Sequence, residues 1–295
     1  MYTNAFKRSC RFVLIKNAQL APQVAMRFNK YMAKTQKELA FLRDLYVQSE
    51  WTKRFTDLAD KHIDLRESEN MLYINAGTGG HALSIDERFG EKTDIFATTE
   101  NEDLLTIARD KAAAVRSSVD FSTLRFEDDA FDAVLADASL VRPAAAVEFI
   151  ENAVRVARIG GDVAVFLPSV GSFGEIFSLM WEVLVSEDLA EHGGAAERLI
   201  TDLPTIGRLE EIGKAAGLVN INTQTATEAF EYENGEEFIA APLIADFLLP
   251  EWLEMLDEDE KERAAKRLAK WIDAEDGDLA FRFTVKTTLL TGEKG

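Results

Sequence analysis

The feature that most constrains this chain is a glycine-rich turn between a short apolar run and a helical stretch. The run Met71–Asn75 is followed by Ala76-Gly-Thr-Gly-Gly80, and residues 81–89 then have helical spacing that ends at Gly90. Glycines after a buried strand let the backbone approach a nucleotide closely, and the next helix N-terminus adds N–H donors. Because tight glycine turns also occur without a ligand, the turn alone indicates only a strand–turn–helix unit.

Apolar runs and helical stretches alternate through the rest of the chain. Strands are predicted at 71–75, 94–98, 131–136, 163–167, 219–225 and 279–290, and helices at 81–89, 102–115, 144–158, 173–184 and 205–216. This alternation predicts a parallel sheet with helices on both faces. Two further helices are expected ahead of the sheet, at 22–46 and 50–61, and residues 187–202 and 236–274 are expected to be helical insertions.

Composition excludes several classes of protein. The chain has 295 residues, 47% of them hydrophobic, which is enough for one large α/β domain and an appendage or for two small domains. It has no apolar run long enough to span a membrane. The single cysteine, Cys10, excludes a disulfide framework and a thiolate zinc site, and the three histidines are scattered. We therefore expect no metal site and a reducing, cytoplasmic location.

Charge is unevenly distributed along the chain. The net charge is -19, yet residues 1–48 hold nine basic and two acidic side chains, which leaves -26 for the remainder. The acidic remainder disfavours nucleic-acid binding except through this basic segment. Three interpretations of the segment stay open: a helical arm lying on the acidic body, which we favour, an organelle-targeting presequence, or a docking arm for an acidic partner such as RNA or a membrane surface.

Four segments in order resemble the class I S-adenosylmethionine (SAM) methyltransferases, in the broad group that includes the ubiquinone and menaquinone biosynthesis enzymes. They begin with MLYINAGTGGHALSIDERFG and are residues 71–90, 95–112, 119–140 and 154–177. The resemblance implies a Rossmann-like α/β fold: a mostly parallel seven-stranded sheet with an antiparallel last strand, plus an N-terminal helical arm. The implied division is a basic arm at 1–48 and a methyltransferase-like domain at 49–295, with helical lid insertions near 170–202 and 236–274.

The resemblance also implies SAM as the cofactor and a role for particular residues. Gly77 and Gly79 match the motif glycines against which the methionine part of SAM lies. Asp120 matches the acid that accepts a hydrogen bond from the adenine amino group, and Phe121 would stack beside the ring.

Other positions depart from the family pattern. Tyr73 stands where the acid that ends the first strand is usual, and Asn75 replaces the first motif glycine, with Ala76 after it. Asn tolerates a positive φ better than most residues, so the turn can survive. Thr99 stands where the ribose-binding acid is expected and Glu100 follows it, so either is a candidate cofactor contact. Losing one carboxylate–diol contact costs on the order of 1.5–3 kcal/mol.

Asp137 is the predicted catalytic residue. It comes just after the fourth strand, where the family's sulfonium and substrate meet, and Ala136 would line the same wall. Ser139 and His81 are further polar candidates. The plainer interpretations are that Asp137 is a solvated strand-end acid and that His81 points outward at a helix start, and we favour the latter.

The segments after the fifth strand are rich in aromatic side chains. They could form a lid suited to an apolar or aromatic small molecule, although most are expected to be core residues. They are Phe173, Phe177, Met180, Trp181, Phe230, Tyr232, Phe238, Phe247 and Trp252.

Two functional hypotheses follow. The first is a SAM-dependent methyltransferase, a monomer or homodimer acting on a small-molecule methyl acceptor. The alternative is a catalytically inactive methyltransferase-fold scaffold or assembly factor that binds a partner through its basic arm. A dinucleotide-dependent dehydrogenase fits less well, because Gly-x-Gly-x-x-Gly is not met at residues 75–80.

Overall fold

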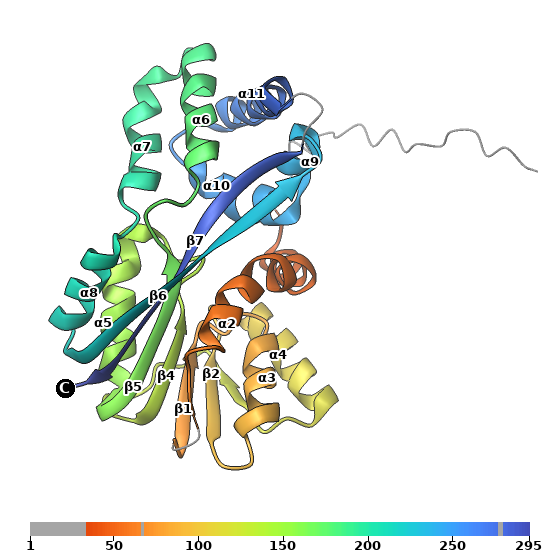
Figure 1. Ribbon diagram of the computed structural model, residues 1–295. Coiled ribbons are helices and arrows are strands. Elements are labelled where there is room, and N and C mark those ends of the chain that lie inside the picture. The colour runs from red at the N-terminus through yellow and green to blue at the C-terminus, as the bar shows by residue number, and fades with distance from the viewer. Residues whose placement is uncertain (1–33, 66–67, 277–279) are drawn as a thin grey trace, which may run out of the picture. The chain divides into compact units, whose positions relative to one another are not determined.

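The computed structural model describes residues 34–65, 68–276 and 280–295. Within them, seven strands form one sheet in the order β3-β2-β1-β4-β5-β7-β6 (Figure 1). The strands are β1 Asn70–Ile74, β2 Asp94–Thr98, β3 Asp120–Ser122, β4 Phe131–Asp137, β5 Ala157–Pro168, β6 Leu218–Tyr232 and β7 Phe281–Lys294. Strands β1 to β5 run parallel, whereas β7 runs antiparallel to both β5 and β6. The predicted fold class is confirmed.

The central strands are buried on both faces. Every residue of β4 is buried, which is why its sequence is nearly continuously apolar rather than alternating. Neighbouring residues still enter different cores, because successive side chains point to opposite faces of a sheet. Tyr73 packs in the core on one face, and Leu72 and Ile74 pack in the core on the other.

Helices cover both faces of the sheet (Figure 1). One core includes buried residues of α2 (Lys53–Ala59), α3 (Gly80–Phe89) and α4 (Glu102–Val115). The other includes those of α5 (Ala146–Val156) and α8 (Ile206–Ala215). The short 3-10 helix η2 (Pro143–Ala145) leads into α5. The carboxyl ends of β1, β2 and β4 therefore lie between two layers of helices, one on each face of the sheet.

The segment before the sheet is one uninterrupted helical run, where the sequence predicts two helices. It begins at α1 (Gln36–Leu42), continues through the π-helical η1 (Arg43–Thr52) and passes into α2, with right-handed backbone at each junction. The residues between the two predicted helices include no glycine or proline, so nothing stops the run. The predicted boundary at residue 48 falls inside η1, and the predictions for residues 1–33 lie outside the described residues.

Strands β6 and β7 are longer than predicted. They stay paired from Leu218–Lys294 to Tyr232–Phe281 and extend past the other strands to a second group of helices (Figure 1). The extension is stabilised by ring stacking, with Phe230 and Phe283 centroids 5.0 Å apart. Between β5 and α8 the chain forms α6 Gly174–Ser186, η3 Ala190–His192 and α7 Gly193–Thr201. Between β6 and β7 it forms α9 Gly235–Ala240, η4 Leu243–Leu248, α10 Leu249–Trp252 and α11 Glu258–Asp276. Most of residues 187–202 and 236–274 are thus helical, and their role as lid insertions stays a prediction.

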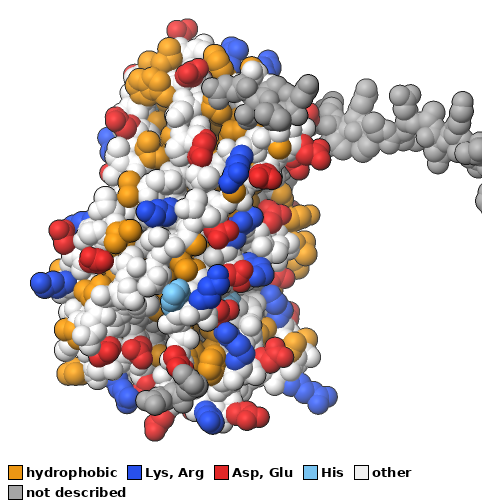
Figure 2. Space-filling view, in the orientation of Figure 1, with side chains coloured by type: hydrophobic (Ala, Val, Ile, Leu, Met, Phe, Trp, Pro, Cys, Tyr) orange, Lys and Arg blue, Asp and Glu red, His pale blue; other side chains and the backbone are white. Residues whose placement is uncertain are grey.

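The surface carries both signs of charge. On the face in Figure 2, acidic and basic side chains are interspersed rather than gathered into one basic stripe. Many form ion pairs, such as Arg54 with Glu228 at 2.9 Å. Among the described helices, none is both long enough and apolar enough to cross a lipid bilayer.

Candidate functional site

The turn after β1 is built on left-handed backbone. Asn75, Gly77 and Gly79 have positive φ values of 58°, 57° and 79°. Asn75 thus takes the left-handed conformation that a glycine would take in its place. The turn is tied to the end of β2, because the Ala76 N–H donates to the Thr98 carbonyl at 2.8 Å. The turn therefore keeps its left-handed backbone although Asn75 replaces the first motif glycine.

Phe121 packs directly beneath this turn. A Cβ built on Gly79 would lie 2.7 Å from the Phe121 Cζ, so the glycine is required by close approach as well as by its φ. Phe121 is fully buried, and Asp120 is the exposed first residue of β3, paired in register with Phe96. Their expected adenine contacts stay predictions, since Phe121 occupies the core side of the turn.

The structure distinguishes the two candidates for the ribose-binding position. Thr99 is buried and its hydroxyl donates to the Asn101 carbonyl at 3.2 Å. Glu100 instead forms an ion pair with the Arg43 guanidinium at 2.6 Å. That guanidinium also lies against the turn, 3.3 Å from the position of a Cβ on Gly77. Arg43 therefore contacts both the glycine turn and the Glu100 carboxylate.

Helix η1 covers the turn, which sequence reasoning did not predict. Besides Arg43, it brings the Gln48 side chain to 3.3 Å from the position of a Cβ on Gly80. An ion pair between Asp44 and Lys111, at 2.7 Å, holds η1 on α4. In the sequence Arg43 is only one charge of the basic arm, and no motif or spacing marks it as a neighbour of Gly77.

Asp137 is buried at the end of β4, which rules out the solvated strand-end interpretation. It is 4% exposed, and its Oδ1 accepts the Ser139 backbone N–H at 2.8 Å. Burial raises the pKa of Asp137 to about 6, although the Ser139 hydrogen bonds and the charge of Arg43 oppose the increase. A raised carboxyl pKa is typical of sites that exchange protons near neutral pH.

Contrary to the expectation from sequence, Ala136 does not line the same wall as Asp137. Its side chain belongs to the core shared with α5 and α8, while Leu135 packs in the opposite core. Adjacent residues of a strand point to opposite faces. The Ala136 side chain therefore does not line the wall that Asp137 faces.

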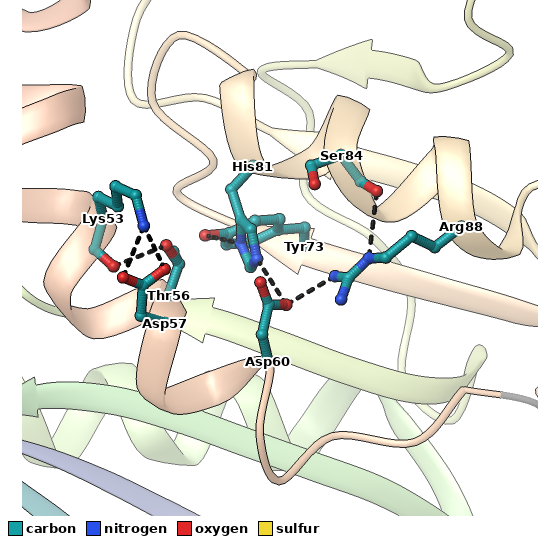
Figure 3. A network of polar contacts seen from close by, with 8 residues as sticks. All are labelled: Lys53, Thr56, Asp57, Asp60, Tyr73, His81, Ser84 and Arg88. Atoms are coloured by element: carbon teal, nitrogen blue, oxygen red, sulfur yellow. Dashed lines mark hydrogen bonds and ion pairs between the residues drawn. The ribbon is translucent and has the colours of Figure 1, made fainter.

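His81 is buried, so the outward-pointing interpretation is wrong. Its Nδ1 lies 3.1 Å from the Tyr73 hydroxyl and its Nε2 lies 3.1 Å from Asp60 Oδ1 (Figure 3). Arg88 also bonds Asp60, at 2.6 Å. Burial alone would raise the pKa of Asp60, but the hydrogen bonds and charges of His81 and Arg88 hold it below its ordinary value.

This hydrogen-bond network gives Tyr73 a structural role. Burial raises the pKa of Tyr73 well above its ordinary value, so the residue stays a neutral phenol. Its hydroxyl ties β1 to the start of α3 through His81, and Asp60 ties both to the end of α2 (Figure 3). Tyr73 thus fixes the helices around the turn instead of supplying the missing carboxylate.

The turn also holds a buried polar atom without a partner. Thr78 is fully buried, and its Oγ1 has no hydrogen-bond partner among the described residues. Burying an unpaired hydroxyl is unfavourable. The backbone of the turn and the Glu100 carboxylate are of the kind that would hold a nucleoside cofactor, and the Arg43 guanidinium now contacts both. In the described residues, no three His, Cys, Asp or Glu side chains form a possible metal site.

A cavity opens beside Asp137, beyond the ends of β4 and β5. Its free volume is about 50 Å³. Its walls combine aliphatic, proline and aromatic side chains with Ser139 and Glu251. They are Trp51, Ser139, Leu140, Val141, Pro143, Ala146, Leu167, Pro168, Phe173, Leu199, Leu203, Pro204, Leu248, Glu251 and Trp252. We refer to it as the β4–β5 cavity.

The predicted aromatic lid is divided between this cavity and the core. Phe173 and Trp252 line the β4–β5 cavity. Phe230, Tyr232 and Phe238 pack around Phe283 in the core instead. Trp181 is 50% exposed on α6 and lines a separate pocket between α6 and α7. Trp181 is therefore not part of the wall nearest Asp137.

Comparison with known proteins agrees with this architecture. Residues 71–161 match a family described as a methyltransferase domain. Over 109 residues the chain is 27% identical to a demethylmenaquinone methyltransferase of Shouchella clausii, covering 35% of this chain and 46% of that protein. The chain thus spans about half the length of this curated relative.

Two solved structures show the same fold. The YcgJ protein of Bacillus subtilis superposes with a TM-score of 0.53 at 14% identity, over 82% of this chain and 98% of that one. Phosphoethanolamine N-methyltransferase 2 of Haemonchus contortus, solved with S-adenosylhomocysteine, gives 0.51 at 15% identity, over 88% and 58%. Residues 71–161 are thus similar to a methyltransferase domain, and the described chain has the fold of these solved structures.

Proposed function

We propose that this protein binds SAM at the β1 turn and transfers its methyl group to a small-molecule acceptor. The observation that carries the proposal is that one guanidinium, that of Arg43, contacts both the positive-φ glycine turn and the Glu100 carboxylate. A backbone cradle and a carboxylate are what a nucleoside and its ribose hydroxyls require.

Asp137 is the proposed proton acceptor. SAM supplies a methyl group already activated on a sulfonium, so the protein mainly orients the nucleophile and excludes water. With a pKa of about 6, the Asp137 carboxylate is mostly charged at pH 7 yet basic enough to accept a proton. Its burial keeps water away from that proton transfer.

Titration calorimetry with SAM and S-adenosylhomocysteine tests the proposal. We expect micromolar binding that weakens about 10- to 100-fold in Glu100→Gln, because a charge-assisted hydrogen-bond pair is lost. Glu102→Gln is the matched control, since Glu102 is an exposed glutamate two residues further on, at the start of α4. No heat at millimolar SAM in a folded sample contradicts the proposal, and equal loss in both variants contradicts the role of Glu100.

One observation favours the scaffold alternative. The Arg43 guanidinium lies between Gly77 and Glu100, where the methionine and ribose parts of SAM would be bound. SAM can bind only if Arg43 releases Glu100. A protein that had lost SAM binding could keep this ion pair permanently.

The Arg43→Gln variant distinguishes a SAM-binding methyltransferase from a scaffold that has lost SAM binding. We expect this variant to bind SAM about fivefold more tightly, because binding no longer has to break a half-buried ion pair worth about 1 kcal/mol. The measurement is the same titration, with Lys111→Gln as a control that breaks the other η1 ion pair. Weaker binding in Arg43→Gln shows that Arg43 holds the cofactor, and no binding by either protein supports the scaffold.

A further inference from the structure

A second cavity lies toward the end of the sheet at which the parallel strands begin and β7 ends (Figure 1). The glycine turn follows the carboxyl end of β1, so the two lie at opposite ends of the strands. Residues 62–65, which lead from α2 toward β1, form one wall of this cavity. Its free volume is about 240 Å³, against about 50 Å³ for the β4–β5 cavity. A single water needs about 10–15 Å³ of such volume, so a small organic molecule has room here. We refer to it as the amino-end cavity.

Two alanines form part of the floor of the amino-end cavity. Ala133 of β4 and Ala164 of β5 line it, and both belong to the core on the face that α2 covers. Their partners on the neighbouring strands are bulkier, since Ala133 pairs with Met71 and Ala164 pairs with Leu135. Buried strand positions usually carry β-branched or aromatic side chains, and alanine leaves that space unfilled. The floor is therefore both hollow and apolar.

The rim of the amino-end cavity is acidic. Asp162 and Glu293 both line it and are directly opposite each other on β5 and β7, where like charges destabilise an antiparallel pair. Desolvation raises the pKa of the Asp162 carboxyl, and the negative charges of Glu293 and Asp64 add to the increase. Among the described residues that line the cavity, His62 is the only one that can carry a positive charge. A bound cation would therefore relieve the repulsion at this rim.

A bulge in β6 adds a neutral polar side chain to the same rim. The pairing of β6 with β7 shifts between Val219 and Asn222, and Asn220 has a left-handed φ of 51°. Bulges of this kind re-aim a side chain and are frequent beside functional sites. Asn220 lines the cavity, and its amide oxygen accepts hydrogen bonds, as the carboxylates do.

The floor and the rim together define the chemistry of a ligand. The rim offers acceptors to a group that donates several hydrogen bonds, and an ammonium donates three. A charge-assisted hydrogen bond to a carboxylate is about twice as strong as a neutral one, whereas an anion would be repelled. An apolar floor has no ligands for a hydrated metal ion but does stabilise a hydrocarbon body. An organic ammonium compound fits both parts.

We propose that the amino-end cavity is a second ligand site that binds a small organic ammonium compound, with the ammonium between Asp162 and Glu293 and the apolar body against Ala133 and Ala164. The site lies apart from the glycine turn, so this proposal does not rest on the proposed function. Loss of SAM binding with retained amine binding contradicts only the methyltransferase proposal. Retained SAM binding without amine binding contradicts only the second site.

The test compares cyclohexylamine with cyclohexanol and cyclohexanecarboxylate, which carry the same ring and differ in charge. Carbon-13 methyl spectra follow binding to the full chain without SAM, and Met71→Leu identifies the Met71 signal among those of the six methionines. We expect cyclohexylamine to shift this signal and to bind about tenfold more tightly than cyclohexanol, with the carboxylate weakest. Equal binding of amine and alcohol, or a Met71 signal that no ligand moves at millimolar concentration, overturns the proposal.

Asp162→Asn supplies the second arm, and Asp94→Asn is its matched control. Asp94 is an exposed aspartate that begins β2 at the same end of the sheet and is not among the residues that line the cavity. Asp162→Asn should weaken cyclohexylamine binding about tenfold and leave cyclohexanol binding unchanged, whereas Asp94→Asn should change neither. Equal weakening in both variants shows that the amine responds to net charge alone, which overturns the site.

Three further comparisons place the ligand. Ala164→Val fills part of the floor with a residue suited to a strand, so it should weaken binding of amine and alcohol alike. Glu100→Gln should leave amine binding unchanged, and weakening there would move the amine to the glycine turn and overturn the proposal. N-acetyl-lysinamide carries the same ammonium on a flexible chain and should bind more weakly than cyclohexylamine, because its chain loses rotamer freedom. Tighter binding of the lysine compound overturns the assignment to a small amine in favour of a partner's lysine.

Discussion

Replacing Gly79 with alanine is expected to destabilise the protein by about 3 kcal/mol and to abolish SAM binding. The left-handed backbone costs a non-glycine residue about 1–2 kcal/mol, and the new Cβ would lie 2.7 Å from Phe121 Cζ and 3.1 Å from Ala108 Cβ. Both neighbours are buried, so neither can move away freely. Thermal unfolding should show a midpoint lower by roughly 6–12 °C.

Gly160→Ala is the matched control for this effect. Gly160 has a nearly equal φ of 75°, but nothing lies within 4 Å of a Cβ built there. It should therefore show only the conformational cost of about 1–2 kcal/mol. Shortening Phe121 to leucine in the Gly79→Ala protein should recover part of the difference. Equal losses at both glycines would show that the contact with Phe121 contributes nothing.

Replacing Asp137 with asparagine is expected to stabilise the protein at pH 8 by about 2–3 kcal/mol. The pKa of Asp137 is raised from 3.8 to about 6 in the folded protein, mainly by burial. The folded state therefore binds more protons than the unfolded state between these values, and its stability falls as the pH rises through that window. Above pH 6 the full cost of a buried charge persists, at about 1.4 kcal/mol for each pH unit that the pKa is raised.

The asparagine variant resembles the protonated acid at every pH, so its advantage should vanish near pH 4. Denaturant unfolding at pH 4 and pH 8 measures both differences in the free energy of unfolding, and the pH 4 experiment is the internal control. Under the proposed function, the same variant should retain SAM binding but lose methyl transfer. An equal change in stability at both pH values would show that Asp137 does not carry the raised pKa, and retained methyl transfer would exclude it as the proton acceptor.

Much of the fold could be predicted from sequence because its signals are local. A parallel strand buried on both faces must be apolar along its length, as Phe131–Asp137 largely is. Gly77 and Gly79 mark a turn because only left-handed backbone fits there, and Asn75 adopts that conformation in place of a glycine. Local signals do not predict the full length of β6, because its extension to Tyr232 depends on pairing with β7 and on the stacking of Phe230 on Phe283.

The candidate site was predictable only in part. Sequence order could place Glu100 and Thr99 at the end of one strand, but only tertiary contacts show that Thr99 turns to Asn101 while Glu100 faces Arg43. The sequence favours an exposed His81 because its partners, Tyr73 and Asp60, lie 8 and 21 residues away. Contacts between distant segments leave no periodic pattern in a single sequence.

The sequence by itself determined the alternation of strands and helices apart from β3, the turn that follows β1 and the acid that ends β4. Each of these follows from local side-chain spacing or from backbone conformations that few residues tolerate. Tertiary structure decided that η1 lies over the turn, that Arg43 occupies the space beside Gly77, and that Asp162 and Glu293 line one cavity. Those relations depend on how helices pack across the sheet, where burial and charge act between residues far apart in the chain.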